Sequence, residues 1–223
     1  MCMTRLRDDR GFTLVELLVA SVVTVIVLGG AVALTSQIQN GYRRQIEDSA
    51  AEQEGRYALD WIGRYLRSAA NNPSAVATTD CPVNSTDVVA FQFDPDADGL
   101  DDDVRVMTDA NPPDGLFGGP AGNCTQANEY VEISLDSGNN TIVFLDMNTG
   151  GAVSTRTDTI IEDLRFVFFD VSHTQLDTTV ANAANNVFYV QTRLTIRTRT
   201  IDPSTGQPAT RTLSSEVRVR SKT

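Results

Sequence analysis

The chain has 223 residues, which gives room for one long helix and one globular domain of ordinary size. Its 29 acidic and 18 basic side chains give a formal net charge of −11 at pH 7. A surface with this balance argues against a protein that binds nucleic acid or anionic membranes through a broad basic face.

A charged leader, residues 1–11, precedes an apolar run from Phe12 to Leu34. The run has 23 residues, and at about 1.5 Å per residue a helix of that length spans the roughly 30 Å hydrocarbon core of a bilayer. Its one ionisable side chain is Glu16. A carboxylate in a membrane helix costs about 2.5–3.5 kcal/mol on insertion scales, so it usually marks a function or a specific partner. A plain single-pass anchor and an uncleaved signal are the alternatives.

Residues 10–20 (Arg-Gly-Phe-Thr-Leu-Val-Glu-Leu-Leu-Val-Ala) resemble the class III signal of type IV prepilins and type II secretion pseudopilins, without a gap. The resemblance implies that a prepilin peptidase cuts between Gly11 and Phe12 and N-methylates Phe12. It also implies that Glu16 pairs with the Phe12 amine of an adjacent subunit during assembly. Such a protein is a single-pass protein of the inner membrane before assembly. Its head is periplasmic or extracellular, and the assembled protein belongs to a pilus or pseudopilus.

The helical pattern continues beyond residue 35 and becomes amphipathic. Apolar side chains recur at three, four or seven positions, which predicts a stripe that packs on a domain. The stripe consists of Ile38, Tyr42, Ile46, Ala50, Tyr57, Trp61, Ile62, Tyr65, Leu66 and Ala69. Pro73 disfavours helical geometry in the residue before it, so we expect one helix from about residue 12 to 70.

From Asp87 onward the period of the apolar residues changes to two, which predicts strands separated by turns. The alternating segments are residues 89–93, 131–135, 142–145, 189–201 and 213–219. Leu164–Val171 is apolar on both faces and is therefore predicted to be a central, covered strand. The expected fold is α+β, with an antiparallel β-sheet head packed against the Tyr57–Leu66 face of the long helix.

The predicted organisation is a prepilin leader, a transmembrane or filament-core half-helix, an amphipathic half-helix and a globular head. The corresponding ranges are 1–11, 12–35, 36–72 and 73–223. This order of one N-terminal helix, an acidic loop and a meander of strands resembles minor pilins of the PilW type and minor pseudopilins of the GspJ type. The resemblance implies the pilin fold and a minor, non-enzymatic subunit.

The three cysteines divide into one in the leader, Cys2, and a pair in the head, Cys81 and Cys124. Outside the cytosol such a pair predicts one disulfide, which closes a loop of more than forty residues. A loop of that size constrains the unfolded chain by roughly 3–4 kcal/mol. Two unpaired thiols are the alternative.

Residues 94–99 (Asp-Pro-Asp-Ala-Asp-Gly) place three carboxylates on one side of a tight loop. Oxygen-rich sets of this kind suit Ca²⁺, which takes six to eight oxygen ligands. An EF-hand loop counted from Asp94 would need a glutamate where Arg105 stands, so the loop is not an EF-hand. The predicted Ca²⁺ ligands are Asp94, Asp96, Asp98, the Leu100 carbonyl, Asp102 and Asp103. An acidic, solvated turn is the alternative.

The sequence lacks the motifs of an enzyme. The single histidine, His173, lies in a polar segment and is predicted to be a loop residue, and no nucleophile elbow, phosphate loop or zinc spacing occurs. An arginine stripe at residues 193–199 lacks interleaved aromatics and belongs to an acidic protein, so nucleic acid is not an expected partner. The expected partners are other pilin or pseudopilin subunits, the prepilin peptidase and the inner membrane.

The sequence therefore predicts a minor structural subunit of a type IV pilus that primes or stabilises the filament. A minor pseudopilin of a type II secretion system is the alternative within the same class. A membrane-tethered calcium- or ligand-binding domain that never polymerises is the alternative from another class.

Overall fold

The chain forms two compact units, Met1–Ile46 and Glu47–Thr223, and the boundary between them falls inside the first helix. The predicted cleavage site at Gly11 and the predicted disulfide of Cys81 and Cys124 lie outside the residues that the structure describes. The computed structural model describes residues 12–69, 90–108, 128–147, 152–180, 183–201 and 204–219.

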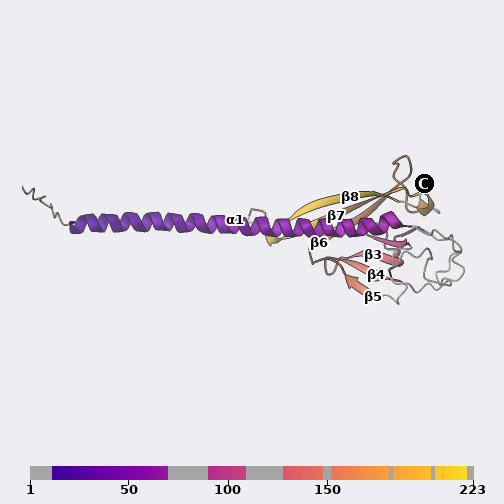
Figure 1. Ribbon diagram of the computed structural model, residues 1–223, viewed down its shortest axis with the longest axis horizontal. Helices are drawn as coiled ribbons and strands as arrows, with labels where there is room; N and C mark the ends of the chain where they lie inside the picture. Colours follow the sequence, from indigo (N-terminus) through magenta and orange to yellow (C-terminus); the bar gives the residue numbers. More distant parts are fainter. Residues whose placement is uncertain are drawn as a thin grey trace, which may run out of the picture. The chain divides into compact units, whose positions relative to one another are not determined.

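The described part of the first unit belongs to helix α1, Leu14–Ser68, drawn in indigo in Figure 1. No proline interrupts α1, and the helix continues through Gly29 and Gly30 without a break. Every residue from Phe12 to Ile46 is exposed. The N-terminal part of α1 is long and apolar enough to cross a membrane, and none of that segment is buried. Its surface therefore needs lipid or other protein to cover it.

The second unit contains a five-stranded antiparallel sheet in the order β1-β2-β3-β4-β5. The strands are β1 (Phe91–Phe93), β2 (Asp103–Met107), β3 (Tyr130–Asp136), β4 (Thr141–Asp146) and β5 (Ala152–Thr155). A tight turn joins β3 to β4, in which the Asn139 N–H donates to Asp136 Oδ1 at 3.0 Å. The turn aligns Asp136 with Thr141 and fixes the register of the hairpin.

A three-stranded antiparallel sheet follows, in the order β6-β7-β8. It contains β6 (Ile161–Phe169), β7 (Tyr189–Ile201) and β8 (Pro208–Arg218), with the 3₁₀ helix η3 (Ala183–Asn186) between β6 and β7. Alternation along β7 buries Val190, Leu194 and Ile196 on one face and leaves Arg193 exposed on the other. This sheet therefore has one core face and one polar face.

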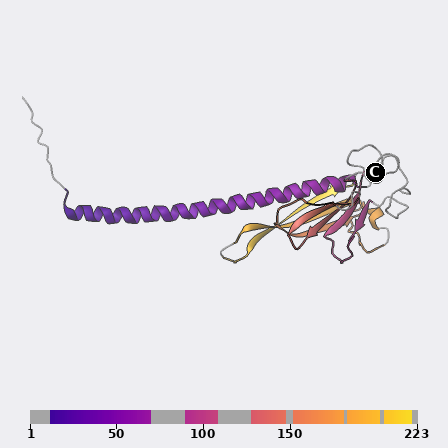
Figure 2. The ribbon, with the colours of Figure 1, turned by 90° about the horizontal axis from the view of Figure 1, so that it is seen from below.

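The C-terminal part of α1 packs against both sheets of its unit. Its buried residues are Ala51, Gly55, Ala58, Leu59, Ile62, Gly63 and Leu66. Figure 2 shows the strands of both sheets on the same side of this part of the helix. Trp61 contacts the β4 residue Phe144, with ring centroids 5.4 Å apart. Ile62 and Leu66 have no exposed surface, and burial of each contributes about 1.5–3 kcal/mol.

The fold class is confirmed, because one long N-terminal helix packs against antiparallel sheets. The predicted strands around residues 131–135, 142–145, 189–201 and 213–219 are also confirmed. β2 and β5 are additional strands, and the strands that the structure describes form two sheets where one was expected.

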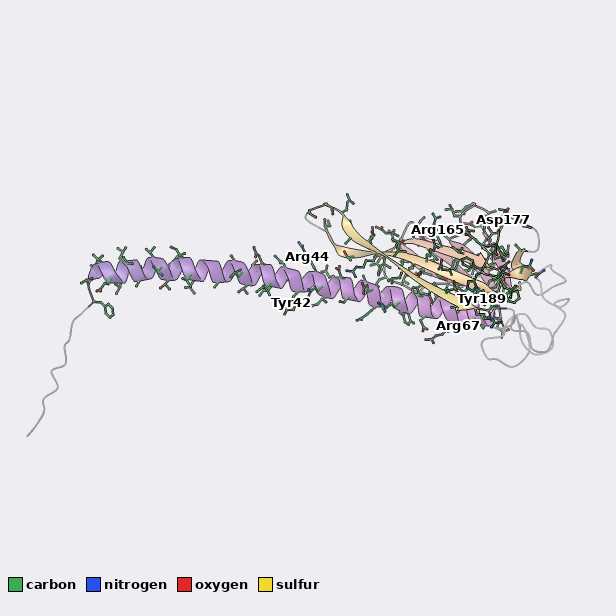
Figure 3. The ribbon with its side chains drawn as sticks, turned by 90° about the horizontal axis from the view of Figure 1, so that it is seen from above. Tyr42, Arg44, Arg67, Arg165, Asp177 and Tyr189 are labelled. Atoms are coloured by element: carbon green, nitrogen blue, oxygen red, sulfur yellow. The ribbon has the colours of Figure 1, made fainter. Side chains whose placement is uncertain are left out.

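Two local predictions are wrong. β6 lies at the edge of the three-stranded sheet and not at its centre, since it pairs only with β7 in the described part of the chain. Its apolar residues on the second face are half-buried and not covered. The predicted stripe on α1 also fails at Ala50, which is exposed, and at Ile38, Tyr42, Ile46 and Tyr57, which are 58–66% exposed. Figure 3 labels Tyr42 and shows it projecting from the helix.

Candidate functional site

Two side chains at the N-terminus of α1 cap each other's backbone groups. The Glu16 N–H donates to Thr13 Oγ1 at 3.2 Å, and the Thr13 N–H donates to Glu16 Oε2 at 3.0 Å. The Thr13 hydroxyl donates to the same carboxylate oxygen at 3.0 Å. This arrangement is a capping box, which satisfies N–H groups that a helix end otherwise leaves unpaired. Glu16 therefore has a role within its own chain as well as any role toward a neighbour.

The capped end is also where the predicted cleavage would create a positive charge. Phe12 directly precedes Thr13, and its side chain is 87% exposed. The partial positive charge of the helix N-terminus favours a carboxylate at this end. A new amine on Phe12 would lie one residue from the Thr13 N–H that Glu16 already binds. The structure thus places the carboxylate at the end of the helix at which the amine would form.

The helix surface that follows the cap suits an apolar environment. Its polar side chains bond back to their own helix: the hydroxyls of Ser21, Thr24 and Thr35 donate to carbonyls three or four residues earlier, at 2.7–2.8 Å. These hydroxyls need no water or partner protein to satisfy them. Glu16 is the only ionisable residue of the run, and the capping box holds it at one end of that run.

The second candidate site is the loop between β1 and β2. One carboxylate oxygen each from Asp94, Asp96 and Asp103 lies within 4.8 Å of the others. Asp94 accepts from the N–H groups of Asp98 and Gly99, both at 3.0 Å. Gly99 has a φ of +81°, and the loop needs glycine there because other residues are strained in that conformation. The loop backbone therefore folds around the Asp94 side chain.

Asp103 forms the buried side of this cluster. It is the first residue of β2, is only 3% exposed, and has no hydrogen-bond partner within normal geometry on either carboxylate oxygen in the part of the chain that the structure describes. Burial, and then the charge of Asp96, raise the pKa of Asp103 to about 7. The backbone N–H of Asp96 opposes this shift only in part.

The six predicted calcium ligands are not all equivalent in the structure. Asp94, Asp96 and Asp103 come together, whereas Asp98 accepts from the Leu100 N–H at 2.8 Å and lies outside this group of three. Burial, and then the charge of Asp98, raise the pKa of Asp102. Asp98 and Asp102 are therefore close enough for their negative charges to repel each other.

Arg105, at the position where an EF-hand would carry its glutamate, is turned to the neighbouring strand. Its Nε donates to Glu132 Oε2 at 2.6 Å, and its Nη1 donates to Gln92 Oε1 at 3.3 Å. The side chains of Arg105 and Glu132 are 22% and 14% exposed. This pair crosses β2 and β3 and leaves the aspartate cluster without the Arg105 charge.

His173 lies in the turn after β6, as predicted, with a φ of +58°. Its Nε2 is 3.1 Å from Glu216 Oε1, and its ring centroid is 3.9 Å from that of Tyr189, which is labelled in Figure 3. The histidine is half exposed and joins the turn to the three-stranded sheet. These contacts hold the turn against β7 and β8.

The N-terminal residues of the chain are also similar to a known family. Residues 6–32 match the family model described as prokaryotic N-terminal methylation motif. The motif indicates a type IV pilin-like protein. It spans the predicted cleavage site, the capping box and most of the apolar run. A motif of this kind points to a structural protein that assembles with pilin subunits after processing by a prepilin peptidase. No curated protein and no solved structure matches the chain.

Proposed function

We propose that this protein is a minor subunit of a type IV pilus, cut between Gly11 and Phe12, N-methylated on Phe12 and assembled through α1. The observation that supports the proposal most strongly is the exposed apolar run Phe12–Leu34, whose single carboxylate, Glu16, is held at the start of the run by Thr13. The methylation motif covers the same residues. The protein inserts in the inner membrane first, and the helix then moves into a filament core.

Glu16 gives the assembly step its specificity. A carboxylate in an apolar environment costs about 2.5–3.5 kcal/mol on insertion scales, and the hydrogen bonds from Thr13 offset part of that cost. A Phe12 amine from an adjacent subunit neutralises the charge that the capping box leaves in place. Apolar contacts alone would let the helices slide along one another, whereas one charge pair in an apolar core selects one register.

The head favours a minor subunit with a place at or near the filament tip. Within the residues that the structure describes, it contains eight strands in two sheets, in addition to the C-terminal part of α1. We propose a PilW-type minor pilin on the resemblance of the sequence, with a GspJ-type pseudopilin of a secretion system as the second candidate. The exposed apolar run supports both candidates. Its carboxylate, Glu16, disfavours a domain that is merely tethered, since a membrane tether needs no carboxylate.

The test compares two substitutions of Glu16. Glu16→Gln keeps an amide oxygen that can accept from Thr13 and so preserves the cap, but it removes the charge; Glu16→Ala removes both. We expect both variants to insert in the membrane and both to be lost from sheared filaments. Glu47→Gln, an equal charge change further along the same helix, should assemble normally. Normal incorporation of Glu16→Gln would show that capping, and not charge pairing, is the role of Glu16.

A further inference from the structure

The β1–β2 loop contains a group of carboxylates that the assembly function does not use. Asp94 and Asp96 come from the loop itself and Asp103 from the first position of β2, and their oxygens lie within 4.8 Å of one another. Asp96 is exposed, Asp94 is half-buried and Asp103 is buried. The cluster is therefore open to solvent on one side and closed on the other.

The buried carboxylate of Asp103, on the closed side of the cluster, is unusual. A buried carboxylate is normally hydrogen-bonded or ion-paired, and an unpaired one is among the more costly groups in a folded protein. Asp103 is 97% buried, and neither of its carboxylate oxygens has a hydrogen bond of normal geometry among the described residues, although the backbone N–H of Asp96 interacts with it. Arg105, two residues away, is committed to Glu132 at 2.6 Å and leaves the cluster without a cationic partner. No ion pair in the described part of the chain balances the charge of Asp103, and the backbone N–H of Asp96 offsets it only in part.

We propose that this loop binds one Ca²⁺ ion through the carboxylates of Asp94, Asp96 and Asp103. All three donors are oxygens, which suit a hard cation and not zinc or copper. Water and neighbouring loop oxygens complete the shell, because Ca²⁺ accepts six to eight ligands in flexible geometry. Mg²⁺ fits less well, since it requires a regular octahedron with short bonds.

The loop is already shaped for the ion. The N–H groups of Asp98 and Gly99 hold Asp94, and the Asp98 N–H also donates to Asp96 Oδ1 at 3.1 Å. These bonds use the edges of the carboxylates and leave further lone pairs for a cation. A bound ion would connect the loop residues Asp94 and Asp96 to the buried carboxylate of Asp103 on β2.

Such a bridge would strengthen the junction between the two sheets. Phe93, the last residue of β1, contacts Phe168 of β6 with ring centroids 4.4 Å apart. On the other side of the cluster, the Phe166 N–H of β6 donates to the Asp101 carbonyl at 2.8 Å. The loop is thus attached to the second sheet at two points, and β1 is the edge strand that the ion would hold in place.

The experiment uses the full chain purified in detergent and treated with EDTA. Calcium chloride is titrated by calorimetry, and thermal unfolding is followed with and without calcium, with magnesium chloride at the same ionic strength as the salt control. We expect saturable heat and a rise in melting temperature of several degrees with Ca²⁺, and at least a tenfold weaker response to Mg²⁺.

The variants separate an ion site from general charge screening. Asp103→Asn and Asp96→Asn keep the size of the side chain. The side-chain oxygen that remains in Asp96→Asn can still accept from the Asp98 N–H. Both should lose the calcium heat and the calcium-dependent shift, and Asp103→Asn should melt higher than wild type in EDTA because it removes a buried charge. Glu162→Gln, an exposed change of equal charge on β6, should respond to calcium like wild type. No calcium response in wild type, or one that Asp103→Asn retains, would overturn the proposal.

Discussion

α1 lies close to the three-stranded sheet at Gly55, where an added side chain would meet core residues. A Cβ at this position would lie 2.7 Å from Leu213 Cδ1 and 3.2 Å from Ile196 Cγ2. Leu213 is partly buried and can rotate away, but Ile196 is 1% exposed and has core neighbours on its other sides. Alanine at residue 55 therefore overpacks the interface.

The magnitude follows from two opposing effects. Replacing glycine by alanine inside a helix normally stabilises it by about 0.5–1 kcal/mol. Overpacking a well-filled core costs about 1–3 kcal/mol. We expect Gly55→Ala to lower the free energy of unfolding of the head by up to about 2 kcal/mol. Gly41→Ala is the control, because an added Cβ there has no neighbour within 4 Å and only the helical gain applies.

Trp61 supplies the assay, because it is the only tryptophan of the chain and it contacts Phe144 across the helix–sheet interface. Its fluorescence during urea unfolding of the full chain in detergent reports when α1 leaves the sheets. Gly55→Ala should unfold at lower urea than wild type, and Gly41→Ala at equal or higher urea. If Gly55→Ala proves as stable as Gly41→Ala, the close packing of α1 on β7 and β8 is refuted.

Two further predictions concern the head. The pKa of Asp103 is raised from an ordinary value of 3.8 to about 7, so in EDTA the folded state binds this proton more tightly than the unfolded state. The stability that the proton contributes is therefore present below about pH 4 and is lost as pH rises through about 7. Melting temperatures from pH 5 to 8 should fall more in wild type than in Asp103→Asn, and parallel curves would contradict this. The proposed Cys81–Cys124 disulfide should leave neither thiol open to alkylation in denatured, unreduced protein, whereas reduction should lower the stability by roughly 3–4 kcal/mol; labelling of both cysteines without reductant would exclude the bond.

Much of the fold was predictable because the sequence signals were local. The apolar run has no proline, so α1 follows from residues near one another in the chain. The alternation along β7 likewise places a strand without knowledge of its partners. The capping box of Thr13 and Glu16 was not among the predictions, although its residues stand three apart in the sequence. Cleavage, methylation and the assembly role of Glu16 remain predictions.

What the sequence did not predict depends on contacts between distant segments. The face of α1 that packs on the sheets contains Ala51, Gly55, Ala58 and Gly63, small residues that a search for large apolar side chains overlooks. Large apolar residues such as Ile46 stay exposed, since period alone does not say which surface covers a helix.

The burial of Asp103 is another property of distant contacts. The residue ends a run of aspartates that looks like a solvated turn, yet it begins β2 and pairs with Ser134 of β3. Only that pairing brings its carboxylate beneath Asp94 and Asp96. The sequence therefore indicated a cation loop but gave no sign that one of its carboxylates would be buried without an ion pair.

The central claim is that α1 becomes an assembly element only after the chain is cut before Phe12. Mass spectrometry of the N-terminal peptide, from protein isolated from the membrane and from sheared filaments, tests it most directly. The account predicts a peptide that begins with N-methyl-phenylalanine at residue 12 in both fractions. A chain that retains Met1, or that begins at any residue other than 12, would contradict it.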